Sequence, residues 1–548
     1  MKLLRFWVFG IMSVILLPSN MAAEWQWSVQ LPGIISNETN DHPQAFLWIP
    51  SDCTQVKAVI IGNHNMTEET LFENSLFRER LSETGIALIW ITPGWDQRWD
   101  ITTGCQEAFE KMMEDFANVS GYSELKYAPI VPLGHSAMAT YPWNFAAWNP
   151  DRTLAIISLH GDAPRTNLTG YGRDNMEWGK RTIDGIPGLM IEGEYEWWED
   201  RVNPALAFRM MYPKSCVSFL CDTGRGHFDI ADRTAGYIAL FLKKALEYRM
   251  PATYDLNKPV ELKKLDPQNG WFAERWHPNQ KKRAKAAPYK EYKGDSHDAF
   301  WYFDKEMAEM TEERYRQERG KKPQYLGFVQ DGQLLTYNPK SHVKVDARFL
   351  PEEDGLTFHL KAVYTDSLHT VISNEHSSTS PRITRICGPV QKVNDTTFTV
   401  RFYRMGMYNK RRTGDICLLA SNDGDGRYKS TVQELSFRIP YRNTEGKRQH
   451  ILFPGIEDVK KGVEVITLQA TSDCGLPVSY YVKEGPAEIE GNKLIFTKIP
   501  PRSKFPLKVT VVAWQYGLAG KVQTAEPVER SFFIVGMPAS KSEFVFLY

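Results

Sequence analysis

Between residues 45 and 250, short apolar runs alternate with longer amphipathic stretches, and this alternation restricts the fold more than any other feature. The runs are QAFLWIP, VKAVIIGN, IALIWIT, YAPIVPLG, LAIISLHG, GLMIEGE and VSFLCDTG. The inner runs are nearly continuous Val, Ile and Leu, which is typical of parallel strands buried on both faces. Strands that alternate with helical patterns in this way predict a doubly wound α/β domain over residues 24–254.

The pattern changes after Pro251. Residues 255–325 are polar, Lys-rich and dotted with aromatics, and we interpret them as a connector that packs on the first domain. Residues 326–440 alternate apolar and polar side chains at period two between Asn, Asp and Gly turns, which predicts a β-sandwich. Residues 441–548 have the same character and are expected to form an immunoglobulin-like sandwich.

The N-terminus reads as a secretory signal peptide over residues 1–23, cut near Ala23. Lys2 and Arg5 precede an apolar stretch that is too short to span a bilayer of about 30 Å. We therefore expect a secreted or periplasmic protein with no membrane insertion. The 66 basic and 66 acidic residues balance, which argues against nucleic acid as a partner. The oligomeric state is not predicted.

The seven cysteines include two pairs that export would permit to bridge. Cys216 and Cys221 form one pair, and Cys387 and Cys417 form the other. No Cys/His spacing resembles a zinc site, so the sequence does not support metal catalysis.

Residues 134–138, Gly-His-Ser-Ala-Met, follow an apolar run and precede a helical pattern. A strand that turns sharply into a helix exposes the hydroxyl of a serine placed there and aims helical N–H groups at its ligand. Ser136 is therefore the predicted nucleophile. The alternative interpretation is a serine that caps a helix. Met138 stands where the common pattern has glycine.

A serine hydroxyl needs a general base, and an acid must orient that base. His227 follows the last apolar run in TGRGHFDIADRT and is the predicted base, against the alternative of a histidine that Asp229 or Asp232 satisfies. The acid is expected after GLMIEG, where Glu196 is favoured. Other candidates for the acid are Glu194, Glu199, Asp200 and Asp162.

Two backbone N–H groups are expected to bind the oxyanion of the reaction. Ala137 would supply one, and Asn65 or Met66, after the run VKAVIIGN, the other. Three aromatic loops lie where the pocket is expected, at the carboxyl edge of the sheet. Stacking on sugars or pairing with a carboxylate is predicted for five residues: Trp95, Arg98, Trp143, Arg165 and Trp197.

The motifs VIIGNHN, LGHSAM, GLMIEGEYE and GRGHFD, in this order, resemble the α/β-hydrolase superfamily. With the signal peptide and the trailing β modules, the chain looks like secreted esterases of bacterial polysaccharide-utilization systems. It is similar in overall pattern to carbohydrate esterase family nineteen, which includes pectin methylesterases. The resemblance implies a Ser136–His227–acid triad, no cofactor, and an ester substrate on a plant cell-wall glycan. Met138 departs from the superfamily's Gly-x-Ser-x-Gly pattern.

The sequence therefore predicts a secreted serine esterase that removes methyl or acetyl groups from a polysaccharide such as pectin. One alternative is a secreted peptidase of the prolyl-oligopeptidase type, although such enzymes carry their extra β domain before the hydrolase domain. Another is a non-catalytic glycan-binding protein on a degenerate hydrolase fold.

Overall fold

A computed structural model describes residues 24–36, 39–165, 176–196, 198–278, 280–404 and 412–536. The predicted signal peptide and Trp197 lie outside the described residues. Within the described part of the chain, no helix combines the length and the apolar character needed to cross a membrane.

An eight-stranded sheet forms the centre of the N-terminal half, in the order β1-β2-β4-β3-β5-β6-β7-β8. Its strands are β1 (Trp27–Gln30), β2 (Gln44–Trp48), β3 (Ala58–Asn63), β4 (Ile86–Thr92), β5 (Ile130–His135), β6 (Ile156–Leu159), β7 (Pro187–Gly193) and β8 (Cys216–Asp222). β1 and β2 run antiparallel, and the other six pair in parallel. Every residue of those six strands is buried, as expected for a sheet covered on both faces. This arrangement confirms the predicted α/β-hydrolase fold class.

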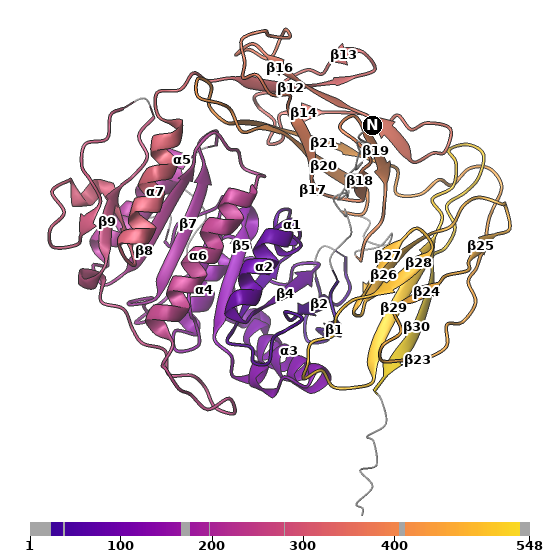
Figure 1. Cartoon of the computed structure of the whole chain (residues 1–548), viewed down its shortest axis with the longest axis horizontal. Coiled ribbons are helices and arrows are strands. Elements are labelled where there is room, and N and C mark those ends of the chain that lie inside the picture. The colour runs from indigo at the N-terminus through magenta and orange to yellow at the C-terminus, as the bar shows by residue number, and fades with distance from the viewer. Residues whose placement is uncertain are drawn as a thin grey trace, which may run out of the picture.

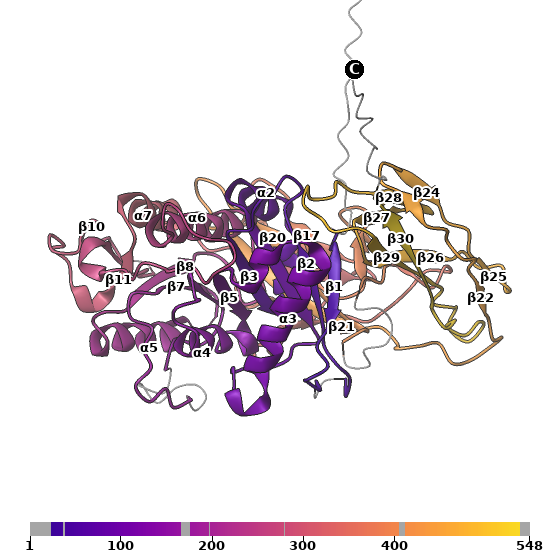
Figure 2. The ribbon, with the colours of Figure 1, turned by 90° about the horizontal axis from the view of Figure 1, so that it is seen from below.

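Helices cover both faces of the sheet (Figure 2). They are α1 (Glu68–Phe72), α2 (Ser75–Thr84), α3 (Cys105–Ser120), α4 (Tyr141–Trp148), α5 (Trp198–Met211) and α6 (Asp232–Arg249). α2 and α6 lie on one face, and α3, α4 and α5 lie on the other. α1 and α2 are separate helices, because the Asn74 side chain accepts the Phe77 N–H and so caps the start of α2.

Residues 267–318 extend this half beyond β8 with β9 (Trp271–Glu274), β10 (Ala287–Pro288), β11 (Ala299–Tyr302) and α7 (Lys305–Glu318). They pack directly on β8, because Phe219 and Phe300 stack with ring centroids 4.9 Å apart. In addition, Ser218 donates to the Trp301 carbonyl at 2.6 Å.

The C-terminal half consists of small, mostly antiparallel sheets that fit the predicted β-sandwich modules. The middle module contains β12 (Tyr325–Gln330), β13 (Gln333–Leu334), β14 (Val345–Asp346), β15 (Thr357–His359), β16 (Lys361–Thr365), β17 (Arg382–Cys387), β18 (Val390–Lys392), β19 (Thr397–Val400), β20 (Asp415–Asn422) and β21 (Thr431–Arg438). The C-terminal module contains β22 (Ile451–Leu452), β23 (Val459–Lys460), β24 (Val465–Thr467), β25 (Thr471–Ser472), β26 (Ser479–Glu484), β27 (Ala487–Glu490), β28 (Lys493–Phe496), β29 (Leu507–Trp514) and β30 (Val528–Val535).

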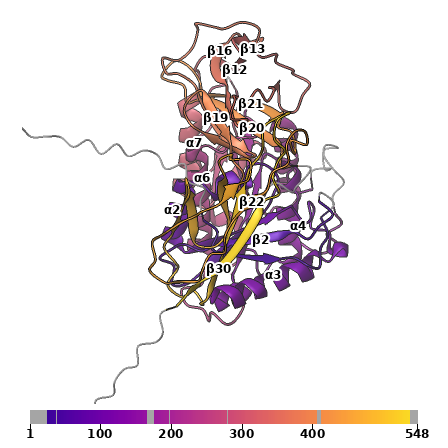
Figure 3. The same cartoon turned by 90° about the vertical axis from the view of Figure 1, so that its right-hand side faces the viewer.

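The three parts are arranged around one another (Figures 1 and 3). The middle and C-terminal modules meet where the rings of Phe402 and Trp514 pack edge to face, with centroids 4.8 Å apart. The middle module is joined to the hydrolase domain by the pair Arg385–Glu69, whose closest atoms are 2.9 Å apart. The C-terminal module reaches the same domain through Arg502 and Glu124, 2.8 Å apart. The two modules therefore contact the hydrolase domain at α1 and at the turn after α3.

None of the seven cysteines is in a disulfide. Cys216 and Cys221 lie near opposite ends of the buried strand β8, five residues apart, so about 16 Å separates them along the strand. That pairing is wrong. Cys387 and Cys417 lie directly opposite each other on β17 and β20, with both thiols free.

Candidate active site

Ser136 occupies a strained turn between β5 and α4. It begins a short 3₁₀ turn directly after β5, with φ of +54°, a left-handed conformation that few residues other than glycine adopt. A Cβ placed on Gly134 would overlap the carbonyl of Met138, so this position requires glycine. Ser136 itself is only partly buried. The turn therefore presents the hydroxyl at the carboxyl edge of the sheet, as the sequence predicts.

Met138 replaces the usual glycine without disturbing this turn. Its side chain is 5% exposed and its terminal methyl lies against Gly94, in the loop after β4. A Cβ on Gly94 would collide with that methyl. In the common motif a glycine at this position leaves room beside the serine turn. Here Gly94, on a neighbouring loop, leaves the room that the Met138 side chain needs.

The loop after β8 places the His227 imidazole beside Ser136. His227 Nε2 lies 2.8 Å from Ser136 Oγ, and His227 Nδ1 lies 2.5 Å from Glu196 Oε2. His227 is 6% exposed, so solvent reaches little of the ring. The structure thus brings together Ser136, His227 and Glu196, one from each of three separate loops.

The other predicted acids have different partners. Glu194 accepts from Lys429 Nζ at 2.8 Å, and Glu199 pairs with Arg275 at 2.9 Å. Asp162 lies 4.0 Å from the Arg201 guanidinium. Asp200 is exposed on the first turn of α5. Of the candidates, Glu196 is the one within hydrogen-bonding distance of His227.

A second imidazole binds the other oxygen of Glu196. His160, which directly follows β6, places Nδ1 2.6 Å from Glu196 Oε1, and the Gly193 N–H donates to the same oxygen at 2.6 Å. Arg201 Nη1 lies 3.3 Å from Glu196 Oε2 and 2.6 Å from the His160 carbonyl. His160 is fully buried and has φ of +49°. These contacts fix the Glu196 carboxylate on all sides.

The electrostatic setting makes His227 a neutral base and Glu196 an anion. Burial lowers the pKa of His227 to about 4, although the Glu196 carboxylate opposes this effect. Burial alone would raise the pKa of Glu196, but His160 and His227 outweigh it and hold that pKa well below its usual value. Glu192, buried beside this charge, has its pKa raised well above the usual value. Burial would lower the pKa of His160, yet Glu196 raises it overall.

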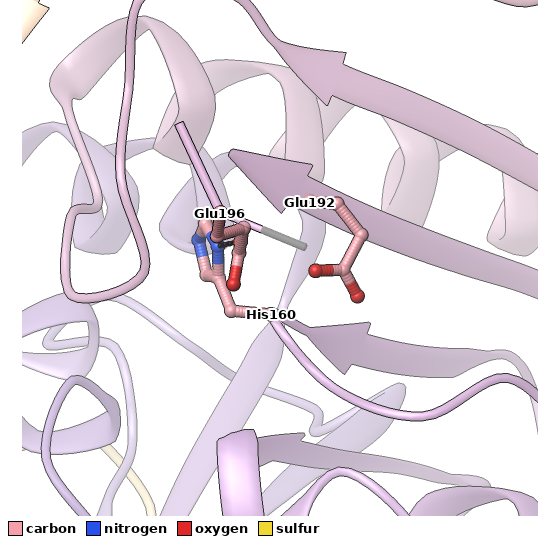
Figure 4. A group of neighbouring side chains, drawn as sticks. All are labelled: His160, Glu192 and Glu196. Atoms are coloured by element: carbon pink, nitrogen blue, oxygen red, sulfur yellow. Dashed lines mark hydrogen bonds and ion pairs between the residues drawn. The ribbon is translucent and has the colours of Figure 1, made fainter. Parts of the chain in front are cut away.

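His160, Glu192 and Glu196 each offer a ligand atom within 4.8 Å of the others, an arrangement that suits a metal ion (Figure 4). Arg201 Nη1, however, already lies 3.2 Å from Glu192 Oε2 and 3.3 Å from Glu196 Oε2. A guanidinium therefore supplies the positive charge between the two carboxylates. We assign this group to the orientation of Glu196.

The loop after β3 does not direct Asn65 and Met66 toward an oxyanion. Their backbone N–H groups donate to Glu68 Oε2, at 3.2 and 3.0 Å. The other oxygen of Glu68 accepts the His135 N–H at 2.9 Å. The buried carboxylate of Glu68 thus occupies both predicted donors, whereas Ala137 sits next to Ser136 as expected.

The predicted sugar-stacking tryptophans are core residues. Trp143 is 1% exposed, donates its indole N–H to the Asp162 carbonyl at 3.0 Å, and packs against Gly188. Trp95 is 8% exposed and lies edge-on to Trp99. Stacking on a substrate is therefore wrong for both, because their rings fill the interior beneath the loops.

The two arginines predicted to bind substrate differ in setting. Arg98 is exposed on the loop after β4, and its role in substrate binding stays a prediction. Arg165 donates to the Tyr212 hydroxyl at 3.1 Å and lies over that ring. Among the described residues, no hydrogen bond joins either arginine to Ser136.

The middle module reaches the candidate active site, which sequence reasoning missed. The exposed ring of His342, in the loop before β14, lies 4.8 Å from the His227 ring and 5.0 Å from Phe228, measured between centroids. Phe228 also packs with Ile386, Leu419 and Val432 of the same module. The loop NPKSHVKVD carries no motif, so only the domain arrangement reveals this contact.

No protein-family model matches the chain, and no curated protein matches it. Solved structures similar to it include Est1E from Butyrivibrio proteoclasticus, with 15% identity over 40% of this chain and 99% of that one, at a TM-score of 0.28. An S-formylglutathione hydrolase from Staphylococcus aureus shows 12% identity over 40% and 98%, at a TM-score of 0.28. The siderophore hydrolase EstA from Aspergillus nidulans shows 14% identity over 43% and 98%, at a TM-score of 0.28. The function proposed below rests on the geometry of the site.

Proposed function

We propose that the protein is a serine esterase that removes methyl or acetyl groups from a plant cell-wall polysaccharide such as pectin. In this proposal it is exported and its signal peptide is cut near Ala23. The polysaccharide is its substrate, and it needs no cofactor.

One observation carries the catalytic proposal, namely the chain of contacts from Ser136 through His227 to Glu196. Nε2 of the imidazole lies 2.8 Å from the hydroxyl, and Nδ1 lies 2.5 Å from the carboxylate. A serine with an imidazole on its hydroxyl and an acid on the far ring nitrogen is the arrangement that activates a serine nucleophile. The strained turn that exposes Ser136 supports the same role.

The chemistry follows from these positions. Ser136 Oγ attacks the ester carbonyl carbon, and its proton moves to His227 Nε2. The negative Glu196 carboxylate holds the Nδ1–H and stabilises the imidazolium. His227 then gives the proton to the departing alcohol oxygen, which leaves the acyl group on Ser136. A water molecule, activated by the same imidazole, hydrolyses the acyl-enzyme, while the Ala137 N–H donates to the oxyanion in both steps.

The leaving group decides which part of the polysaccharide is held on Ser136. For a methyl-esterified uronate, methanol leaves and the carbonyl carbon of the sugar forms a new ester bond to Ser136 Oγ. For an acetylated sugar, the sugar hydroxyl leaves and acetate remains. The exposed His342 of the middle module, whose ring lies 4.8 Å from that of His227, supports a substrate that extends beyond the hydrolase domain.

Substitution of the nucleophile tests the proposal. Ser136→Ala should reduce release of methanol from methyl-esterified pectin, or of acetate from acetylated xylan, by at least about 10³-fold. Ser123→Ala, which changes an exposed serine of the same domain, is the matched control. Wild-type activity in Ser136→Ala would contradict the proposal. Cleavage of peptides by the wild type, with no release of methanol or acetate, would indicate a peptidase instead.

A further inference from the structure

A cavity of about 390 Å³ lies between the loop after β3 and the middle module. His64, Asn65 and Met66 line it from the hydrolase domain. The middle module lines the opposite side with residues that include Val343, Asp346, Arg412, Asp415, Ser436 and Arg438. Its volume falls within the range of about 300–1,000 Å³ that is usual for small-molecule sites.

Two contacts place this cavity next to the candidate active site. On one side, the Asn65 side-chain amide donates at 2.9 Å to the carbonyl of His135, the residue before Ser136. On the other, Val343 directly follows His342, whose ring lies 4.8 Å from that of His227. A ligand in the cavity would therefore be held between two parts of the chain, one of which contacts the residue before Ser136 and the other the ring of His227.

The cavity contains paired charges of both signs. Arg438 Nε lies 2.6 Å from Asp415 Oδ1, and Arg438 keeps 61% of its side chain exposed. Asp346 accepts from the Ser436 hydroxyl at 3.2 Å. Arg412 donates to the Asn65 carbonyl at 2.9 Å. The wall that the middle module supplies thus contains both donors and acceptors.

Glu69 also lines the cavity, but the middle module neutralises it. Arg385 lies 2.9 Å from one of its carboxylate oxygens and Arg404 lies 3.3 Å from the other. The remaining charges in the wall, two aspartates and two arginines, balance. Met66 and Phe437 add apolar surface to this lining. A polyanion would meet the aspartates, whereas a ring with an apolar face and polar edges meets both kinds of surface. Hydroxyl groups donate and accept at once, so they match this lining.

We infer that this cavity binds an uncharged, hydroxyl-rich sugar unit next to the ester that Ser136 attacks, with Arg438 and Asp415 as hydrogen-bonding partners. The inference rests on the proposed function, because it assumes that the ester belongs to a glycan. A methyl-esterified uronate and an acetylated xylose both qualify as uncharged units, whereas a free uronate does not. The middle module is then part of the substrate-binding site.

Substitution at Arg438 separates binding of the sugar from the chemistry. Arg438→Ala should raise KM about tenfold for a methyl-esterified oligogalacturonide or an acetylated xylo-oligosaccharide, whichever the wild type hydrolyses, with kcat little changed. Its kcat/KM on p-nitrophenyl acetate, which is too small to fill the cavity, should stay within about twofold of wild type. Arg382→Ala is the matched control, since it removes an exposed arginine, paired with Asp423 at 2.8 Å, from the same sheet outside the cavity.

Binding measured by calorimetry on the Ser136→Ala protein supplies a readout that needs no turnover. There, Arg438→Ala should weaken binding of the neutral oligosaccharide about tenfold, and the de-esterified oligogalacturonide should bind more weakly than its esterified form. The inference would be overturned if Arg438→Ala lost kcat/KM equally on p-nitrophenyl acetate and on the oligosaccharide, or if it left oligosaccharide binding unchanged. Tighter binding of the de-esterified form than of the esterified form would overturn it as well. A wild type that binds these oligosaccharides but hydrolyses no ester would instead refute the proposed function alone.

Discussion

Substitution of His160 tests how the Glu196 carboxylate is positioned, because the His160 imidazole binds Oε1 of Glu196 and His227 binds Oε2. Replacing His160 with leucine removes a 2.6 Å hydrogen bond to a buried carboxylate. A hydrogen bond to a charged group contributes about 1.5–3 kcal/mol, which corresponds to about 10–150-fold in rate if all of it is expressed in the transition state. Glu196 retains the Gly193 N–H and Arg201. We therefore expect a loss in kcat near the lower end, about tenfold, with KM unchanged.

His160→Asn separates the hydrogen bond from the charge, because its side-chain amide can donate where Nδ1 did. We expect His160→Asn to recover most of the kcat that His160→Leu loses. Both variants remove a group whose positive charge lowers the pKa of His227. That pKa should therefore rise in both.

The pH profile shows this rise directly. His227 accepts the Ser136 proton only when it is neutral, so kcat/KM falls as the pH drops through the pKa of His227, which is about 4 in the wild type. The acid limb of kcat/KM on p-nitrophenyl acetate should move to higher pH in both variants. Thermal unfolding of each variant controls for loss of the fold. A His160→Leu enzyme with wild-type kcat and an unmoved acid limb would refute the assigned positioning role.

Three further results are expected. Glu196→Gln should lower kcat by on the order of 10⁴-fold, because the amide no longer stabilises the imidazolium; steady-state kinetics that remain within tenfold of wild type would exclude Glu196 as the acid. Gly134→Ala should abolish measurable ester hydrolysis and lower the melting temperature, since its Cβ overlaps the Met138 carbonyl, and an active, equally stable variant would contradict the geometry of the turn. Glu68→Leu, which leaves three backbone N–H groups without their acceptor, should reduce the free energy of unfolding by several kcal/mol in denaturant titration, given about 1–3 kcal/mol for each buried group left unpaired.

The sequence predicts the central sheet well because the physical signal is local. Each parallel strand is an apolar run, and burial on both faces requires that pattern. The order of Ser136, Glu196 and His227 along the chain also follows the strands, so the three residues could be named before their distances were known. Met138 departs from the Gly-x-Ser-x-Gly pattern, yet its side chain fits the structure. Gly94, on another loop, leaves room for the Met138 methyl group.

Other parts of the site depend on contacts that no local pattern encodes. Glu68 reads as an ordinary acid in the first turn of a helix, yet its carboxylate binds the N–H groups of Asn65 and Met66. Trp143 lies in a segment predicted to face the pocket, but its ring points into the core. His342 is more than one hundred residues from His227 in sequence and meets it only because the middle module folds over the sheet edge.

Covalent labelling of the nucleophile tests the central claim most directly. The wild-type protein, treated with a fluorophosphonate probe and analysed by intact and peptide mass spectrometry, should gain one adduct, on Ser136. His227→Ala should label far more slowly, because no base would remove the hydroxyl proton. An unlabelled wild type, or an adduct on any other residue, would contradict the account.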